Sequence, residues 1–410
     1  MPHRPHATPF PRLLLPGLVL AVLAACGRTP PAAPASPPVA GSAAPVAIAS
    51  EHGPLELREV VTGLVHPWAL AFLPDGSMLV SERPGRLQHV SADAARIVQI
   101  RGVPRVYADG QAGLLDVALS PRFGEDRLVY LAFAEPNLRG NLCGTAVARG
   151  RLVDEALQEV EVIYRQQPKL SAGSHLGARL VFDDAGHLFV TQGDNRTAPE
   201  AAQALDKLQG KLVRVMADGA IPQDNPFTGH EDARAEIWSY GHRNIQGAAL
   251  HPQTRRLWTS EHGPMGGDEL NLPLPGRNYG WPLATDGLDY SGAAVPGSRG
   301  RSVPGMEAPH HVWKKSPALS GMAFYTADAL PQWRGNLLLG ALADRELIRL
   351  ELDGERVVHE ERLLGQRRER IRDVRQGPDG AVYLLTDEPR GKLLRLGPQA
   401  SPAGTPPPLR

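Results

Sequence analysis

Short apolar runs joined by turn residues recur along most of this chain. The first pair, 69–72 and 78–80, flanks Pro74-Asp75-Gly76. Asp-Gly and similar turns between two apolar runs are typical of β-hairpins. Five further pairs follow along the sequence: 115–119 with 128–133, 179–182 with 188–191, 247–250 with 257–259, 321–325 with 336–339, and 371–375 with 382–386. The pattern therefore predicts six hairpins.

Each hairpin is followed by one or two more apolar runs, such as 210–214 and 392–396. Units of roughly 45 to 75 residues, each building one four-stranded sheet, are typical of β-propeller blades. We therefore predict an all-β fold, a six-bladed β-propeller with four-stranded antiparallel blades, over residues 53–398. The 43 glycines and 39 prolines support a turn-rich fold. A sandwich or a two-domain β protein is the alternative, but neither requires six copies of one hairpin.

The N-terminus has the features of a secretory signal. Arg4 and Arg12 precede an apolar run, 13–25, that is too short to span a bilayer. The sequence Leu-Ala-Ala-Cys-Gly at 23–27 resembles the lipobox of bacterial lipoproteins, which predicts a lipoprotein-type signal peptide over 1–26 with Cys26 lipidated. No acidic residue follows Cys26, so this resemblance implies the periplasmic side of the envelope and an outer-membrane anchor. An ordinary signal cleaved nearby is the alternative.

Two segments consist largely of Pro and small residues, with almost no charge, and cannot build a core. Residues 27–52, rich in Pro and Ala, are predicted to be a tether, and the Pro-rich residues 399–410 a disordered tail. Cys143 is the only other cysteine, so no intrachain disulfide can form if Cys26 is acylated. Lys plus Arg and Asp plus Glu are equal at 44 each, which disfavours nucleic acid as a partner.

Polar residues cluster just before or after the first hairpin of the second to sixth units, most densely in residues 236–281. In a propeller these places surround the axis, so their side chains should converge. Taken singly, each residue is more often structural; their recurrence at equivalent places favours a shared site. The clusters contain Gln111, His175, Arg243, Asn244, Gln246, Glu261, His262, Trp313, Arg370 and Arg372.

The arginines indicate the charge of the ligand. Arg370 and Arg372 are two residues apart and so project from one face of a strand. Together with Arg243 they would repel one another unless an anion lay between them, and Arg binds carboxylates in bidentate pairs. We therefore expect a central, anionic ligand, planar enough to lie against Trp313.

No dinucleotide or phosphate-loop fingerprint, nucleophile elbow or zinc-helix motif occurs. Asp268 and Glu269 follow Gly-Pro-Met-Gly-Gly and supply hard oxygen ligands, which suit calcium better than zinc. A solubilising pair of loop carboxylates is the alternative interpretation.

Five separated motifs resemble the soluble quinoprotein sugar dehydrogenases, in particular the PQQ-dependent aldose sugar dehydrogenases of the glucose/sorbosone dehydrogenase type. They are Pro-Trp-Ala-Leu at 67–70, the runs 241–246 and 261–271, Asn-Tyr-Gly-Trp-Pro at 278–282, and Arg-Ile-Arg-Asp at 370–373. The resemblance covers about 57–396 and implies a six-bladed propeller with the quinone on its axis.

The resemblance also implies roles for individual residues. His175 would be the general base that takes the proton from the anomeric hydroxyl while hydride passes to the quinone. Arg243 would stabilise charge on the reduced quinone, and the carbonyls of Gly263 and Pro264 would bind a calcium ion that polarises it. Gln111, Asn244, Arg370 and Arg372 are implied to hold the cofactor, together with Arg243. From the polar clusters themselves we add Gln246 and Trp313 to the expected cofactor-binding residues. Asp268 and Glu269 match residues that bind a second, structural calcium in some members.

Two departures bear on cofactor affinity and substrate preference. Ala343 stands about where the glucose-oxidising relative has a cofactor-contacting lysine, and Ser174 stands where that relative has an acid. The expected partners are an aldose and an external electron acceptor, a quinone or cytochrome, with the chain a monomer or homodimer. The rival functions are a calcium-dependent sugar lactonase and a non-enzymatic carbohydrate-binding propeller.

Overall fold

Strands make up nearly all of the regular structure in the computed structural model, which describes residues 37–171 and 173–399. Within this part, α1 (Phe123–Asp126) is a single helical turn, and η1 (Pro199–Ala202), η2 (Pro331–Trp333) and η3 (Gly365–Arg367) are short 3-10 turns. None of the helices in the described ranges is long and apolar enough to cross a membrane. The predicted signal peptide, and nearly all of the predicted tail, lie outside the described residues.

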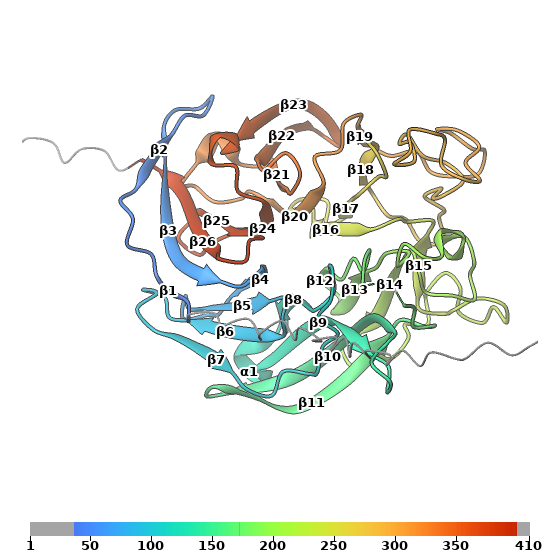
Figure 1. Ribbon diagram of the computed structural model, residues 1–410, viewed down its shortest axis with the longest axis horizontal. Coiled ribbons are helices and arrows are strands. Elements are labelled where there is room, and N and C mark those ends of the chain that lie inside the picture. Colours follow the sequence, from blue (N-terminus) through green and yellow to red (C-terminus); the bar gives the residue numbers. More distant parts are fainter. Residues whose placement is uncertain (1–36, 172, 400–410) are drawn as a thin grey trace, which may run out of the picture. The chain divides into compact units, whose positions relative to one another are not determined.

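Six sheets surround a common axis, which confirms the predicted six-bladed β-propeller (Figure 1). In the first five, four antiparallel strands follow one another in chain order from the axis outward. These strands are β4 (Pro67–Phe72), β5 (Met78–Glu82), β6 (Arg86–Val90), β7 (Ile97–Ile100); β8 (Leu114–Leu119), β9 (Leu128–Pro136), β10 (Cys143–Val153), β11 (Ala156–Arg165); β12 (Leu180–Phe182), β13 (His187–Thr191), β14 (Lys211–Met216), β15 (Ile237–Tyr240); β16 (Ile245–Leu250), β17 (Leu257–Glu261), β18 (Asp268–Asn271), β19 (His311–Trp313); β20 (Leu319–Phe324), β21 (Leu337–Ala341), β22 (Leu347–Asp353) and β23 (Arg356–Leu363).

The sixth sheet joins the two ends of the domain. Its inner strands are β24 (Ile371–Gln376), β25 (Val382–Thr386) and β26 (Gly391–Pro398), and its next strand is β3 (Leu55–Leu64), from the start of the chain. β3 (blue) lies beside β26 (red) in Figure 1, with Leu57 opposite Leu396. This pairing closes the ring, so no sheet edge opens between first and last blade.

Two short strands lie within the segment predicted to be a tether. β1 (Val39–Ala40) and β2 (Val46–Ile48) both pair with β3. The described part of residues 27–52 is therefore attached to the sixth sheet by backbone hydrogen bonds.

The hairpin turns explain why these residues form these strands. In the first, Leu73 donates its N–H to the Ser77 carbonyl at 2.8 Å, and the Asp75 side chain accepts the N–H of Ser77 at 3.0 Å. Gly76 has φ 82°, which a glycine adopts without steric cost. The six predicted hairpins are the six innermost strand pairs, which confirms the prediction.

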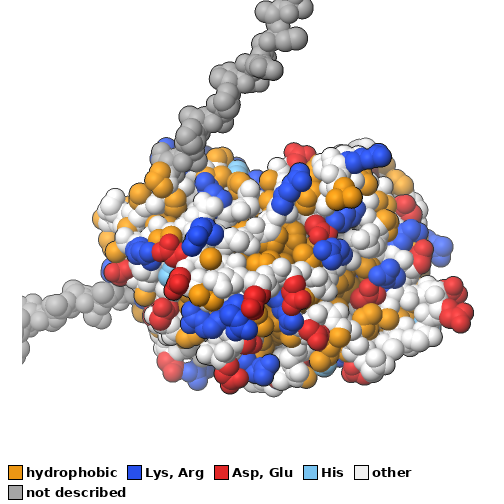
Figure 2. All heavy atoms as spheres, turned by 90° about the horizontal axis from the view of Figure 1, so that it is seen from below, with side chains coloured by type: hydrophobic (Ala, Val, Ile, Leu, Met, Phe, Trp, Pro, Cys, Tyr) orange, Lys and Arg blue, Asp and Glu red, His pale blue; other side chains and the backbone are white. Residues whose placement is uncertain are grey.

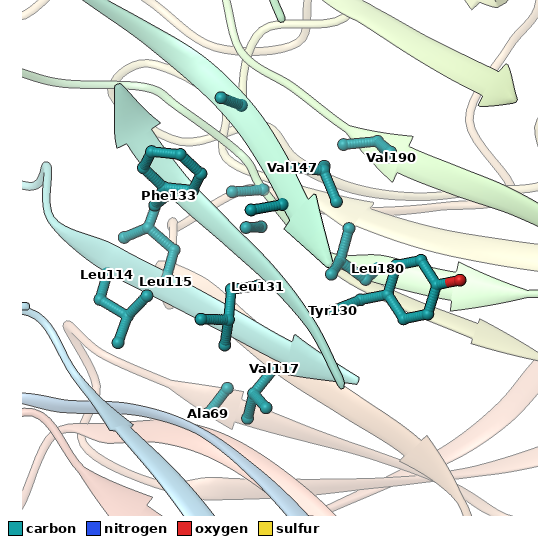
Figure 3. Close-up of a cluster of buried hydrophobic side chains, with 14 of the residues drawn as sticks. Ala69, Leu114, Leu115, Val117, Tyr130, Leu131, Phe133, Val147, Leu180 and Val190 are labelled. Carbon is teal, nitrogen blue, oxygen red and sulfur yellow. The ribbon is translucent and has the colours of Figure 1, made fainter. Parts of the chain in front are cut away.

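Apolar side chains fill the space between blades. Figure 3 shows one cluster in which Ala69 of β4, Leu115 of β8, Leu131 of β9 and Leu180 of β12 are buried together. Burial of one such leucine contributes about 1.5–3 kcal/mol. Charged side chains of both signs are interspersed over the face in Figure 2, as the balanced composition predicts.

The innermost strands all run in one direction along the axis. We call the end where they begin the cavity end and the end where they finish the far end. A cavity of about 210 Å³ lies at the cavity end, and a hollow of about 1060 Å³ lies at the far end.

Candidate active site

The cavity is lined by residues from all six blades, at the starts of their inner strands and in nearby loops. Cationic, amide and aromatic groups dominate its polar surface. The lining residues are Trp68, Arg83, Gln111, Leu115, Leu176, Gly177, Gln246, His262, Ala318, Leu342, Arg370, Arg372 and Asp387.

Three guanidiniums, from Arg83, Arg370 and Arg372, line the cavity together with one carboxylate, Asp387. Arg372 donates to Asp387 from Nη2 at 2.5 Å and to the Gln246 side-chain oxygen at 2.9 Å. Burial lowers the pKa of both Arg83 and Arg370; Asp387 opposes this effect, and repulsion by Arg372 adds to it. Burial alone would raise the pKa of Asp387, but Arg372 and His66 hold it below its ordinary value. The cavity thus has an excess of positive charge.

Trp68 supplies the aromatic wall of the cavity, and a buried ionic cluster lies next to it. The Trp68 ring lies 4.3 Å from the Arg179 guanidinium and 5.8 Å from that of Arg372. Arg179 Nη1 is 3.0 Å from Asp116 Oδ1 and 3.0 Å from Asp373 Oδ1, and Arg375 contacts both carboxylates. These four groups lie on or beside the middle of inner strands, between the cavity and the far-end hollow.

His175 is held at the edge of this cavity by both its backbone and its side chain. Its N–H donates to the Gln111 side-chain oxygen at 3.0 Å, and its Nδ1 lies 2.7 Å from Asp194 Oδ1. Trp281 Nε1 donates to the other Asp194 oxygen at 2.8 Å. His175 also has φ 49°, a left-handed conformation, which for a residue other than glycine is found disproportionately at functional sites.

This geometry fixes the chemistry that the imidazole can perform. Because the Asp194 carboxylate accepts from Nδ1–H, the lone pair of His175 is on Nε2. Burial lowers the pKa of His175, and the charge on Arg243 lowers it further, although Asp194 opposes both. The ring is therefore neutral near pH 7 and can accept a proton at Nε2.

Arg243 lies beside a smaller pocket that contains Trp281 and Glu261. Its Nη1 donates to the Gly263 carbonyl at 2.6 Å, its guanidinium lies 5.2 Å from the Trp281 ring, and its Nε is buried without a partner. Glu261 accepts the backbone N–H of Arg243 at 2.7 Å and also contacts His242. Arg243 is therefore fixed through its backbone, while its side chain retains one donor for a ligand.

The side chains of Asn244, Gln246 and His262 lie between the two pockets. Asn244 Oδ1 accepts from Gly177 N–H at 3.2 Å and from Gln246 at 3.1 Å. Burial lowers the pKa of His262 to about 3, so this ring is neutral. Asn244 Nδ2 lies 3.5 Å from His262 Nδ1.

The two predicted metal carboxylates differ in their surroundings. Asp268 accepts the N–H of Gly263 with one oxygen and that of Leu319 with the other, both at 3.0 Å, so it holds the backbone. Glu269 lies opposite Glu261 in the β17–β18 pair, and Asn271 donates to both. Burial, and then Glu261, raise the pKa of Glu269 well above its ordinary value. No group of three or more His, Cys, Asp or Glu suited to a metal occurs within the described ranges.

The structure brings most of the predicted residues together. Gln111, Gln246, Arg370 and Arg372 line the cavity. His175, Arg243 and Asn244 adjoin it through the hydrogen bonds given above. The carbonyl of Gly263 faces Arg243, and Pro264 follows in the same loop.

Trp313 is the exception. It belongs to β19, the outermost strand of the fourth sheet, and its indole donates to Glu360 at 2.8 Å. A residue on an outer strand cannot reach the axis, so Trp313 does not line the cavity. Ala343 is exposed beside Leu342, which does line it.

Several site residues were not predicted. Asp194 and Asp387 lie in loops whose sequences signal only turns, and Arg83 occupies a short hairpin turn. Trp68 and Trp281 belong to two of the motifs that carry the family resemblance, which implies no role for either. The one feature of the sequence that could have indicated a site residue is an aromatic residue next to the start of an inner strand, as at Trp68.

Known proteins resemble this chain over most of its length. The Glucose / Sorbosone dehydrogenase family model matches residues 64–395. Aldose sugar dehydrogenase YliI of Escherichia coli K12 is 52% identical over 339 residues, which span 82% of this chain and 91% of that protein.

Solved structures agree. The soluble aldose sugar dehydrogenase of Escherichia coli in its apo form has a TM-score of 0.82 at 49% identity, covering 84% of this chain and 100% of that one. A PQQ-bound aldose sugar dehydrogenase from Streptomyces coelicolor has a TM-score of 0.68 at 28% identity, covering 87% and 100%. These relatives are oxidoreductases, and this chain belongs to the glucose/sorbosone dehydrogenase family.

Proposed function

We propose that this protein oxidises aldose sugars at the anomeric carbon to lactones, with PQQ as its cofactor. The observation on which this rests is the cavity itself. Three guanidiniums, one carboxylate and a tryptophan line a buried space next to a His175–Asp194 pair. The PQQ-bound relative supports the identity of the cofactor.

The residues present fit a planar polycarboxylate. Arg83, Arg370 and Arg372 can bind carboxylates in bidentate pairs. An anion would offset the repulsion by Arg372 that adds to burial in lowering the pKa of Arg83 and Arg370. Trp68 offers an aromatic face, and Gln111 and Gln246 offer amide groups. The partnerless Nε of Arg243 is a further donor toward a bound oxygen. When bound, the quinone supplies a hydride acceptor.

The protein's own residues supply the acid–base chemistry. His175 Nε2 takes the proton from the C1 hydroxyl of the sugar, and Asp194 stabilises the imidazolium that forms. Trp281 holds the second oxygen of Asp194, so the carboxylate cannot rotate away. Arg243 places a positive charge beside the reacting centre, where negative charge develops.

Calcium is part of this proposal, and its candidate ligands differ in the contacts that they already make. The Gly263 carbonyl accepts from Arg243, so an ion bound there would share that oxygen with a guanidinium. Asp268 uses both oxygens for backbone N–H groups. Glu269 and Glu261, two carboxylates held close together in a buried setting, fit a divalent cation better.

The lactonase and the carbohydrate-binding propeller predict different behaviour. Purified protein would be mixed with PQQ and calcium and assayed with an aldose and a redox dye. Dye reduction that requires PQQ supports the dehydrogenase. Hydrolysis of gluconolactone without PQQ would favour the lactonase, and inactivity in both assays the binding propeller.

The cellular setting is also proposed. We place the protein on the periplasmic side of the envelope, attached through lipidated Cys26, with electrons passing to an external quinone or cytochrome. The sequence at 23–27 supports this. Mass spectrometry of the mature N-terminus tests it, because an unacylated terminus downstream of Cys26 would contradict the anchor.

A further inference from the structure

We propose that the cavity end of the propeller docks on an anionic lipid bilayer. This inference rests on the proposed lipid anchor, which would hold the protein at a membrane. The orientation is inferred from the exposed side chains of the described residues. Nothing in it depends on the identity of the cofactor.

The most exposed large apolar side chains lie at the cavity end. Because strands alternate in direction, the loop between the second and third strand of each blade lies at this end. Leu138 is in that loop of the second blade and is 104% exposed. Tyr290, in the connection from β18 to β19, is 62% exposed. Its neighbour Leu288 pairs with Met265, and Met265 lies in the second-to-third strand loop of the fourth blade. Val39, 56% exposed, lies on β1 beside the cavity-side end of β3. These are the three most exposed large apolar side chains of the described residues.

Arginines without carboxylate partners surround the same end. In four of the six blades the second-to-third strand loop carries an exposed arginine: Arg139, Arg196, Arg345 and Arg390. Arg196 stacks on Tyr290 at 5.8 Å, and Arg345 donates to a backbone carbonyl. None of the four forms an ion pair with a described carboxylate. Guanidiniums next to exposed aromatic and aliphatic groups fit the phosphate and upper acyl region of a bilayer.

The entry point of the chain favours a bilayer over an acidic protein. Carboxylates, including Asp109 and Glu200, are also exposed at this end, so charge alone does not select the partner. A Cβ placed on Gly63, at the cavity-side end of β3, would lie 3.5 Å from Pro38 Cα. The chain therefore enters the fold at the cavity end. The eleven residue-to-residue steps from Cys26 to Pro37 can span at most roughly 40 Å, so an anchored chain keeps this end near the membrane.

Site-specific quenching tests the orientation. A fluorophore would be attached to Leu138→Cys and, as the matched control, to Val358→Cys, which is exposed at the far end on β23. Cys143 is buried and should not react. The full chain would be bound to phosphatidylglycerol vesicles that contain a headgroup nitroxide lipid. We expect strong quenching at position 138 and little at 358. Arg139→Gln should weaken vesicle binding of chain that lacks the acyl group about fivefold, and Arg122→Gln at the far end should not.

Equal quenching at the two positions, stronger quenching at 358, or no binding to vesicles would overturn the proposal. So would crosslinking of position 138 to an acidic protein in preference to lipid. Sugar oxidation with a soluble dye is measured in parallel on the parent chain. Its failure would refute the proposed function and leave the docking result standing, because quenching requires neither cofactor nor sugar.

Discussion

Replacing Asp194 with asparagine tests the role of the buried carboxylate next to His175. Asp194 is buried and accepts hydrogen bonds from His175 Nδ1, Trp281 Nε1 and the N–H of Arg196, at 2.7, 2.8 and 2.7 Å. Asparagine has almost the same shape, but it has only one oxygen and no charge. The three donors cannot all be satisfied, because the amide nitrogen must face one of them.

The expected loss follows from the tautomer. If the amide nitrogen faces His175, the ring proton moves to Nε2 and the lone pair needed for catalysis is lost. If the oxygen faces His175, the imidazolium still lacks a counter-charge. General-base catalysis contributes about 10²–10⁴-fold, so kcat should fall by that factor, about 2.7–5.4 kcal/mol in the barrier. KM for the aldose and the Kd for PQQ should change little. Steady-state dye reduction gives the first two quantities, and a fluorescence titration gives the third.

Trp281→Phe is the matched control, since it removes one hydrogen bond to Asp194 and leaves the charge. We expect a loss of kcat within about tenfold. Thermal unfolding of both variants excludes a general loss of fold. An Asp194→Asn enzyme with parental kcat would refute the assignment of His175 as an oriented base.

Four further outcomes are expected. His175→Ala should reduce turnover to near background while PQQ still binds with close to parental affinity; parental turnover would contradict the base assignment. Because burial lowers the pKa of His175, the imidazole stays neutral on acidification until pH falls below the ordinary value of about 6.5. The acid limb of the kcat/KM profile should therefore lie below about pH 6.5. An acid limb above that pH would contradict a lowered pKa for His175. Arg372→Gln should weaken PQQ binding by about 1.5–3 kcal/mol, or roughly 10- to 150-fold, and leave Asp387 with a weaker partner; unchanged affinity in a titration would be inconsistent with the cavity being the cofactor site. Glu269→Gln should abolish most of any rise in Tm on adding calcium, and an equal rise in both proteins would place the ion elsewhere.

The local pattern was sufficient to predict the repeated part of the fold. Asp75-Gly76 and its counterparts specify turns through neighbouring residues alone, so the six inner hairpins follow from short stretches of sequence. The closing strand could not be found in this way. Leu57 pairs with Leu396 across nearly the whole domain, and nothing near either residue indicates the partner.

In the candidate site, too, a local pattern predicts some residues, while others can be found only from the fold. Arg370 and Arg372 share a strand, and the period of two places both in the cavity. The prediction that Trp313 contacts the central ligand does not hold, because Trp313 lies on β19, the outermost strand of its sheet. The sequence does not show how far from the axis β19 lies, since a long connection separates it from β18. Asp194 was missed because a carboxylate in a Gly-Asp-Asn loop resembles an ordinary turn. Only the fold shows that this loop passes beneath His175.

The most direct measurement of the central claim is a single turnover with deuterated sugar. Protein reconstituted with PQQ and calcium would be mixed anaerobically with excess glucose or 1-²H-glucose, and reduction of the bound quinone followed by absorbance. We predict one lactone per bound quinone and a primary isotope effect on its reduction that persists, at a far lower rate, in His175→Ala. Lactone hydrolysis without quinone reduction, or reduction with no isotope effect, would contradict hydride removal from the anomeric carbon.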